Sequence, residues 1–133
     1  YFTGTQFFNA APMAAARATL LELQKIDAAN MMTNIGNNLN DGLVDIAASH
    51  GYDLVATGVP AMPYYRLANV NGKTHQMWVD KCVQRGVYLL SYHNHFVSTA
   101  HTDADLQRTF EIVDDAFTAL GPASAQIEKA ANA

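Results

Sequence analysis

Apolar residues recur every three or four positions in two long stretches at the start of the chain, which is the spacing of an amphipathic helix. The first stretch predicts a helix over residues 10–26, and its apolar face holds Met13, Ala16, Leu20 and Leu23. The second predicts a helix over residues 28–49, and its apolar stripe holds Ile35, Leu39, Leu43 and Ile46. Gly36 and Gly42 lie inside this second helix, where each costs about 1 kcal/mol relative to alanine, so packing must hold it together.

Two further helices are predicted in the second half of the chain. One runs over residues 74–84 and is stopped by Gly86, because glycine readily adopts the positive φ that ends helices. The other has the clearest ends: Thr102 is a good N-cap, acidic residues follow in its positively charged first turn, and Gly121 and a proline end it. Its apolar stripe consists of Leu106, Phe110, Val113, Phe117 and Leu120.

Three short runs of β-branched, aromatic and aliphatic residues predict strands over residues 53–57, 64–68 and 87–90. A turn rich in glycine and proline joins the first two. The order helix, helix, strand, strand, helix, strand, helix predicts an α+β domain, with helices on one face of a small, mostly antiparallel sheet. The residues after Gly121 are expected to form a polar, alanine-rich tail.

The composition narrows the class of protein. The chain has 133 residues, enough for one domain with a hydrophobic core, and 50% of them are hydrophobic while 15% are charged. A net charge of −4 argues against nucleic-acid binding, which needs a basic surface. No apolar run reaches the roughly 18 residues of a membrane span. We therefore expect neither nucleic acid nor membrane as a partner. Because Cys82 has no partner cysteine, we expect a reducing, cytoplasmic setting.

A turn followed by a helix of small residues opens the chain. Gly4 and Thr5 are candidates for binding a phosphate, because a glycine lets the main chain approach closely and a hydroxyl adds a hydrogen-bond donor. By itself a Gly-Thr pair more often marks an ordinary turn before a helix. Its weight as a binding motif therefore depends on the rest of the sequence pattern.

A second block of sequence is more specific. It consists of Gly86-Val87-Tyr88-Leu89 and, after a short loop, of residues 96–102, Phe-Val-Ser-Thr-Ala-His-Thr, which open the last helix. Together the two blocks resemble the C-terminal part of class III aminotransferases, the pyridoxal-phosphate (PLP) enzymes that include glutamate-1-semialdehyde aminomutase. In register with that family are Gly4, Thr5, Asn9, Met13, Ala14 and Ala15. The chain departs from the family pattern at Phe8, Ala10 and Pro12.

The resemblance implies a fold-type-I enzyme with pyridoxal 5'-phosphate as cofactor, which moves an amino group between an amino donor and a keto acceptor. Gly4 and Thr5 would contact the cofactor phosphate, with Thr5 reaching the cofactor of the neighbouring subunit of a homodimer. Residues 1–27 would form the phosphate-contact turn and a helix that bridges from the large domain. Residues 28–121 would form the small C-terminal domain, and residues 122–133 the tail.

The same resemblance places the catalytic lysine outside this chain. Transamination requires a lysine that forms a Schiff base with the cofactor, and in related enzymes it precedes the Gly-Thr pair by a few dozen residues. None of the four lysines follows the expected strand and turn; they are Lys25, Lys73, Lys81 and Lys129. The chain also begins at Tyr1 inside an apolar stretch. We therefore expect a piece of a longer enzyme, whose remainder is its partner, and no catalytic residue within residues 1–133.

The loop between the halves of the second block carries candidate substrate residues. His93, Asn94 and His95 can orient a polar substrate, although a structural or solvent-facing role is equally open. The aminomutase loop is two residues longer and has a glutamate that this chain lacks, which favours a transaminase over an isomerase. Arg66 could bind a substrate carboxylate through two hydrogen bonds, but on an alternating strand it would more simply face water.

The residues also suggest two alternatives, a metal site and a function without catalysis. His93, His95 and His101 invite a metal site, but zinc requires three or four ligands at a recognisable spacing, so we expect no metal. Cys82 is expected to be a small buried hydrophobic residue. The alternative function is a stand-alone α+β module that binds a small ligand or a partner without catalysis. A colourless sample that contains only this chain would favour that module.

Overall fold

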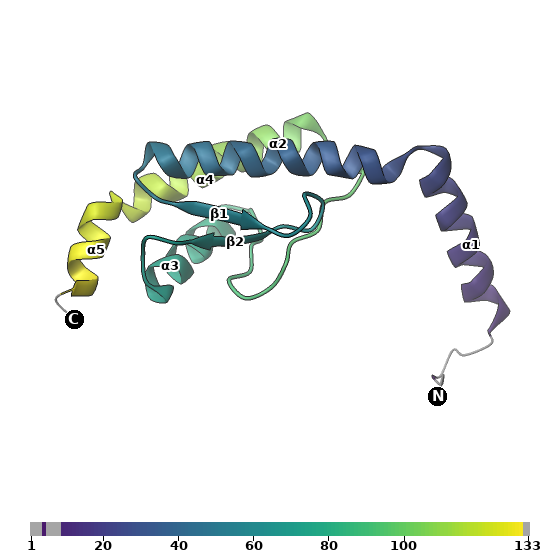
Figure 1. Cartoon of the computed structure of the whole chain (residues 1–133), viewed down its shortest axis with the longest axis horizontal. Helices are drawn as coiled ribbons and strands as arrows, with labels where there is room; N and C mark the ends of the chain where they lie inside the picture. Colours follow the sequence, from purple (N-terminus) through teal and green to yellow (C-terminus); the bar gives the residue numbers. More distant parts are fainter. Residues whose placement is uncertain (1–3, 5–8, 132–133) are drawn as a thin grey trace. The chain divides into compact units, whose positions relative to one another are not determined.

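The computed structural model describes residues 4 and 9–131 (Figure 1). The chain divides into two compact units, residues 1–31 and residues 32–133. In chain order the elements are α1 (Ala10–Lys25), α2 (Ala28–Ser49), β1 (Leu54–Thr57), β2 (Tyr64–Leu67), α3 (Gly72–Gln84), α4 (Asp103–Leu120) and α5 (Ala123–Ala131). The four predicted long helices and the first two predicted strands are therefore confirmed.

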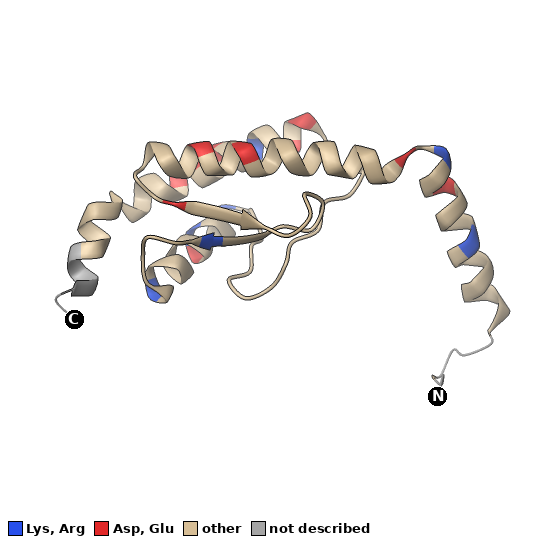
Figure 2. Cartoon of the chain, in the orientation of Figure 1, with Lys and Arg blue, Asp and Glu red and all other residues tan. Residues whose placement is uncertain are grey.

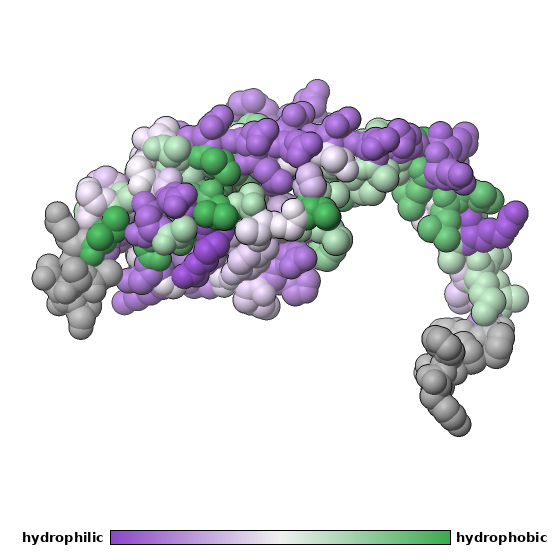
Figure 3. Space-filling model, in the orientation of Figure 1, coloured by the Kyte–Doolittle hydropathy of each residue, from purple (hydrophilic) through white to green (hydrophobic). Residues whose placement is uncertain are grey.

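Helix α1 makes up most of the described part of the first unit. The side chain of Asn9 caps it by accepting a hydrogen bond from the Ala11 N–H at 3.1 Å. None of its residues is buried, and Leu20 is 67% exposed. Apolar side chains therefore lie at the surface along this helix (Figure 3). A helix with an uncovered apolar face gains little stability from packing, so α1 lacks the main support that helices have in folded proteins.

Strands β1 and β2 form an antiparallel hairpin, the sheet of the second unit. The register pairs Leu54 with Leu67 and Ala56 with Tyr65. Because side chains alternate along a strand, these four residues share one face, and three of them are almost completely buried. Arg66 lies on the opposite face. Side chains of the two strands therefore alternate between a buried face and an outer face.

The hydrophobic core lies between this face of the hairpin and the helices. Leu43 of α2, Trp78 and Cys82 of α3, and Phe117 of α4 are each at most 1% exposed and belong to one cluster with the buried hairpin residues. Helix α3 packs against α4. The α+β fold is confirmed, and Cys82 is a buried hydrophobic residue as expected.

The ends of α4 follow the sequence closely. The Thr102 hydroxyl accepts a hydrogen bond from the Asp105 N–H, and the Asp105 carboxylate accepts one from the Thr102 N–H at 2.8 Å, which forms a capping box. The Asp105 carboxylate accepts hydrogen bonds from both the Thr102 N–H and the Thr102 hydroxyl, and these two bonds hold the pKa of Asp105 below its usual value. At the other end, Gly121 has a φ of 84°, the left-handed conformation that stops the helix.

Two expectations were wrong. Residues 87–90 form no strand, so the sheet among the described residues consists of β1 and β2 alone. The predicted tail is helical: α5 begins at Ala123, which is 4% exposed, and the Gln126 side chain donates to the Leu120 carbonyl at 2.7 Å. An alanine-rich segment has high helix propensity, and these contacts anchor its first turns to the core.

Charged residues are scattered over the elements in Figure 2, and no basic stripe is visible in that view. Among the described residues, the helices are all too short or too polar to cross a membrane.

Candidate functional site

The predicted phosphate contact lies at the edge of what the structure describes. Gly4 is exposed, and a Cβ added to it would have no atom within 4 Å. Thr5 lies outside the described residues. The described residues thus offer no cradle against which a phosphate could be fitted. The contact through Gly4 and Thr5 stays a prediction.

The loop after residue 90 surrounds a hollow of about 480 Å³. His93, Asn94 and His95 all line it, so the structure brings these three candidates together. Arg66 is not among its lining residues. Aromatic side chains supply much of the remaining wall, and Tyr88 and Tyr92 are 76% and 79% exposed. These two tyrosines were not among the candidates predicted from the sequence, although their closeness to His93 and His95 along the chain could have indicated them.

His95 holds the loop in place. Its Nε2 accepts a hydrogen bond from the Leu90 N–H at 3.0 Å, which leaves Nδ1 to donate to the Pro63 carbonyl at 3.3 Å. The ring also packs on Tyr65, with 5.1 Å between centroids. Burial lowers the pKa of His95, while the Pro63 carbonyl opposes this and the charge of His93 adds to it. Both ring nitrogens of a neutral His95 are thus committed to the backbone, which makes it a positioning residue.

His93 and Asn94 remain exposed to the hollow. His93 Nδ1 lies 2.9 Å from the Asn94 carbonyl, and its ring lies 6.1 Å from that of Phe96. The Asn94 side chain makes no hydrogen bond to a described residue. Of the three loop candidates, these two therefore have polar groups available to a substrate.

Arg66 is placed on the outer face of β2, opposite Val55. It is half-buried and forms no ion pair with a described acidic residue. Its positive charge acts instead on the buried His75, whose pKa is lowered mainly by burial and further by Arg66, while the backbone of Ser91 opposes both. The structure therefore gives Arg66 an electrostatic neighbour, and its role in substrate binding stays a prediction.

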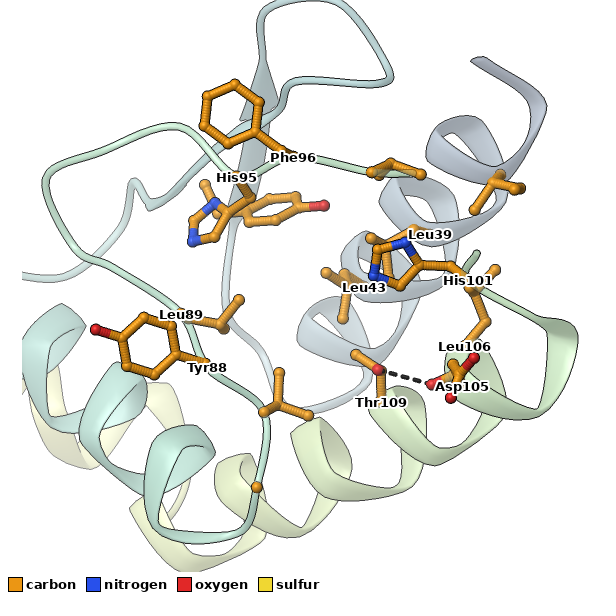
Figure 4. Close-up of a pocket in the computed structure, with 15 residues that line it drawn as sticks. Leu39, Leu43, Tyr88, Leu89, His95, Phe96, His101, Asp105, Leu106 and Thr109 are labelled. Carbon is orange, nitrogen blue, oxygen red and sulfur yellow. Dashed lines mark hydrogen bonds between the residues drawn. The ribbon is translucent and has the colours of Figure 1, made fainter. Parts of the chain in front are cut away.

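An apolar pocket of about 310 Å³ lies next to the loop (Figure 4). Leucine side chains from α2 and α4 line it, and His95 and Phe96 border it from the loop. His101 and Asp105 stand at its polar end. The volume falls at the lower limit of small-molecule sites, and the mostly apolar lining is typical of them. Sequence reasoning missed this pocket, because its walls come from helices and loops far apart in the chain.

The burial of His75 and His95 predicts that acid destabilises the second unit. Both folded-state pKa values lie below the usual 6.5, so between those values and 6.5 the unfolded chain binds more protons than the folded one. The free energy of unfolding should have its full value above about pH 6.5. As the pH is lowered from there, it should decrease by at most about 1.4 kcal/mol per pH unit for each histidine. Urea unfolding at several pH values measures this, and His75→Gln should reduce the slope. An unchanged slope would assign the acid sensitivity to other groups.

No group of three or more histidine, cysteine, aspartate or glutamate side chains within the described part of the chain is arranged to hold a metal ion. His101 has a local contact instead, since its Nδ1 accepts a hydrogen bond from the Ser98 N–H at 3.0 Å. This bond lies in the turn that precedes α4. His101 thus helps to shape the entrance to that helix.

The chain is similar in sequence to two groups of enzymes. It is 36% identical over 121 residues to the aminopentol aminotransferase of Sphingopyxis macrogoltabida, an alignment that covers 90% of this chain and 29% of that protein. It is 28% identical to the glutamate-1-semialdehyde 2,1-aminomutase of Akkermansia muciniphila and 27% to that of Pyrobaculum islandicum. These alignments cover 91% and 90% of this chain and 32% and 31% of the aminomutases. No protein-family model matches.

The fold is similar to that of a solved enzyme. The FumI protein of Sphingopyxis sp. MTA144, whose structure shows its PLP internal aldimine form, superposes with a TM-score of 0.82 at 35% identity. That match covers 90% of this chain and 29% of FumI. The fold is therefore similar to that of one part of a PLP-dependent enzyme.

In sequence and in fold, the chain is similar to part of PLP-dependent aminotransferases. It spans about three-tenths of the length of the relatives it matches.

Proposed function

We propose that this chain is the C-terminal part of a class III aminotransferase that moves an amino group between an amino donor and a keto acceptor. The observation that carries the proposal is the match to FumI, which holds PLP, over 90% of the chain at 35% identity and a TM-score of 0.82. A second observation agrees with it: the sequence is 36% identical to an aminopentol aminotransferase. A transaminase is favoured over an aminomutase, because identity to the aminomutases is 28% or lower and the loop glutamate is missing.

PLP would supply the electron sink that stabilises negative charge at the carbon bearing the amino group. This chain's own residues would bind the cofactor phosphate and orient the substrate. Gly4 and Thr5 would hold the cofactor phosphate, while His93 and Asn94 would contact a polar part of the substrate from the loop that His95 fixes. The Schiff-base lysine would come from the remainder of the protein, so residues 1–133 alone are proposed to be inactive.

Further features are proposed with the activity. The enzyme would be a homodimer in which Thr5 reaches the cofactor of the neighbouring subunit, and it would be cytoplasmic. Residues 1–27 would bridge from the large domain. This division is supported by α1, which buries none of its residues and so has an apolar face available to the rest of a longer protein.

The test is to compare the complete protein with residues 1–133 alone. The complete protein should show the yellow absorbance of bound PLP and transfer amino groups from an amine to a keto acid, while the 133-residue chain should do neither. A colourless and inactive complete protein would contradict the proposal. Binding of a small ligand or a protein by the isolated chain would then favour the alternative, a non-catalytic α+β module.

Replacing Thr5 by alanine should weaken PLP retention in the complete protein by about 1–3 kcal/mol, as for the loss of a hydrogen bond to a charged group. Equilibrium dialysis of PLP, followed by its absorbance, gives the dissociation constant. Thr118→Ala is the matched control, because Thr118 is exposed on α4 and outside every described hollow. An unchanged dissociation constant for Thr5→Ala would remove Thr5 from the site.

A further inference from the structure

Residues 87–90 have the sequence of a strand but lack a strand partner. The run Val-Tyr-Leu-Leu is rich in residues that favour strands, and Leu89 is buried while Tyr88 is exposed. The segment is nevertheless irregular in the structure. A strand-like sequence without a ladder indicates that its hydrogen-bonding partner is missing.

The backbone of this segment is fixed at both ends and unpaired between them. The Val87 N–H donates to the Cys82 carbonyl at 3.0 Å, and the Leu90 N–H donates to His95 Nε2 at 3.0 Å. The N–H groups of Tyr88 and Leu89 have no acceptor among the described residues. Leu89 is only 7% exposed, and unpaired backbone groups shielded from water are costly and rare in complete proteins.

Two hollows border the same two residues. Tyr88 and Leu89 line the apolar pocket of about 310 Å³ together with Leu39, Leu43 and Leu106 (Figure 4). They also line a second hollow of about 320 Å³ beside α3. There is therefore room next to this segment for another stretch of chain, and an apolar pocket to receive some of its side chains.

We propose that residues 87–90 pair with an extended segment of the same protein from outside residues 1–133. The added strand would bond through its main chain to Tyr88 and Leu89, as in strand addition to a free edge. Every second side chain would be apolar and enter the pocket of Leu39, Leu43 and Leu106, while those between would be polar. The inference rests on the proposed function, because the relatives are more than three times as long as this chain.

Hydrogen exchange followed by mass spectrometry tests the pairing, with residues 1–133 and the complete protein compared at the same pH. The amides of Tyr88 and Leu89 should exchange quickly in the 133-residue chain and about 100-fold more slowly in the complete protein. The exposed amides of residues 92–94 are the internal control and should stay fast in both. Equally fast exchange of Tyr88 and Leu89 in the complete protein would overturn the inference. Slow exchange in the 133-residue chain, with protection that increases as its concentration is raised, would also overturn the inference, because a second copy would then be the partner.

A pair of proline variants gives an independent test. Tyr88→Pro removes one of the unpaired donors, whereas Tyr92→Pro alters an equally exposed tyrosine of the loop. Tyr88→Pro should lower the Tm of the complete protein by several degrees more than it lowers that of residues 1–133, and Tyr92→Pro should show no such difference. Equal shifts for Tyr88→Pro in both proteins would contradict strand addition. PLP binding and amino transfer by the complete protein separate this failure from a failure of the proposed function.

Discussion

Replacing Phe117 by alanine is expected to lower the free energy of unfolding by about 3–5 kcal/mol. The Phe117 side chain is completely buried and lies at the centre of an aromatic cluster. Its ring centroid is 5.4 Å from that of Trp78 and 4.9 Å from that of Tyr52. Removing the ring loses this burial and leaves a cavity between α3 and α4, which the rigid indole of Trp78 can fill only in part.

Urea unfolding followed by Trp78 fluorescence measures the effect, since Trp78 is the single tryptophan and touches the altered site. Phe96→Ala removes the same group from a side chain that is 63% exposed, and it should cost less than about 1 kcal/mol. Similar losses for the two variants would contradict the description of Phe117 as the centre of the core. A total loss of about 5 kcal/mol would approach the whole stability of a small domain.

The elements predicted correctly are those whose signals are local. The N-cap of α4 is contained in the four residues from Thr102 to Asp105, and its apolar stripe recurs along one helix. The hairpin follows from two alternating runs and one short turn. Each of these features depends on residues close together in sequence, so a period of 3.6 or 2 and a capping residue suffice to find it.

The two errors depend on contacts that the sequence does not display. Residues 87–90 have strand propensity, but a strand exists only with a hydrogen-bonded neighbour, and none is present among the described residues. The segment after Gly121 has helix propensity, and it folds as α5 because Ala123 and Gln126 find buried positions. Propensity was overruled in the first case and underestimated in the second.

The candidate site shows the same division. The sequence identified the loop with His93, Asn94 and His95, and the structure places all three around one hollow. It could not assign different tasks to them, because the partner that commits His95 is the carbonyl of Pro63, 32 residues away. The apolar pocket was also out of reach, since its walls are brought together by the fold.

Helix α2 requires glycine at position 36, and the reason is the close approach of another part of the backbone. A helical glycine is normally improved by alanine, by about 1 kcal/mol. A Cβ at Gly36, however, would overlap the carbonyl oxygen of Pro60 and lie 3.0 Å from the Ala61 nitrogen. These are backbone atoms of the turn between β1 and β2, and the turn is held by hydrogen bonds from the His95 and Val97 N–H groups to the Pro63 and Ala61 carbonyls. It cannot move without breaking them.

We therefore expect Gly36→Ala to lower the free energy of unfolding by about 3 kcal/mol, in spite of the gain in helix propensity. Gly42→Ala is the matched control in the same helix. Its Cβ would lie 2.5 Å from the ring of Phe110, a half-buried side chain that can turn aside, so the net change should be within about 1 kcal/mol of zero. Thermal and urea unfolding of both variants measure the two changes in the free energy of unfolding. A Gly36→Ala variant as stable as Gly42→Ala would show that the turn can withdraw from α2, and that the loop carrying His95 is less firmly anchored than its hydrogen bonds indicate.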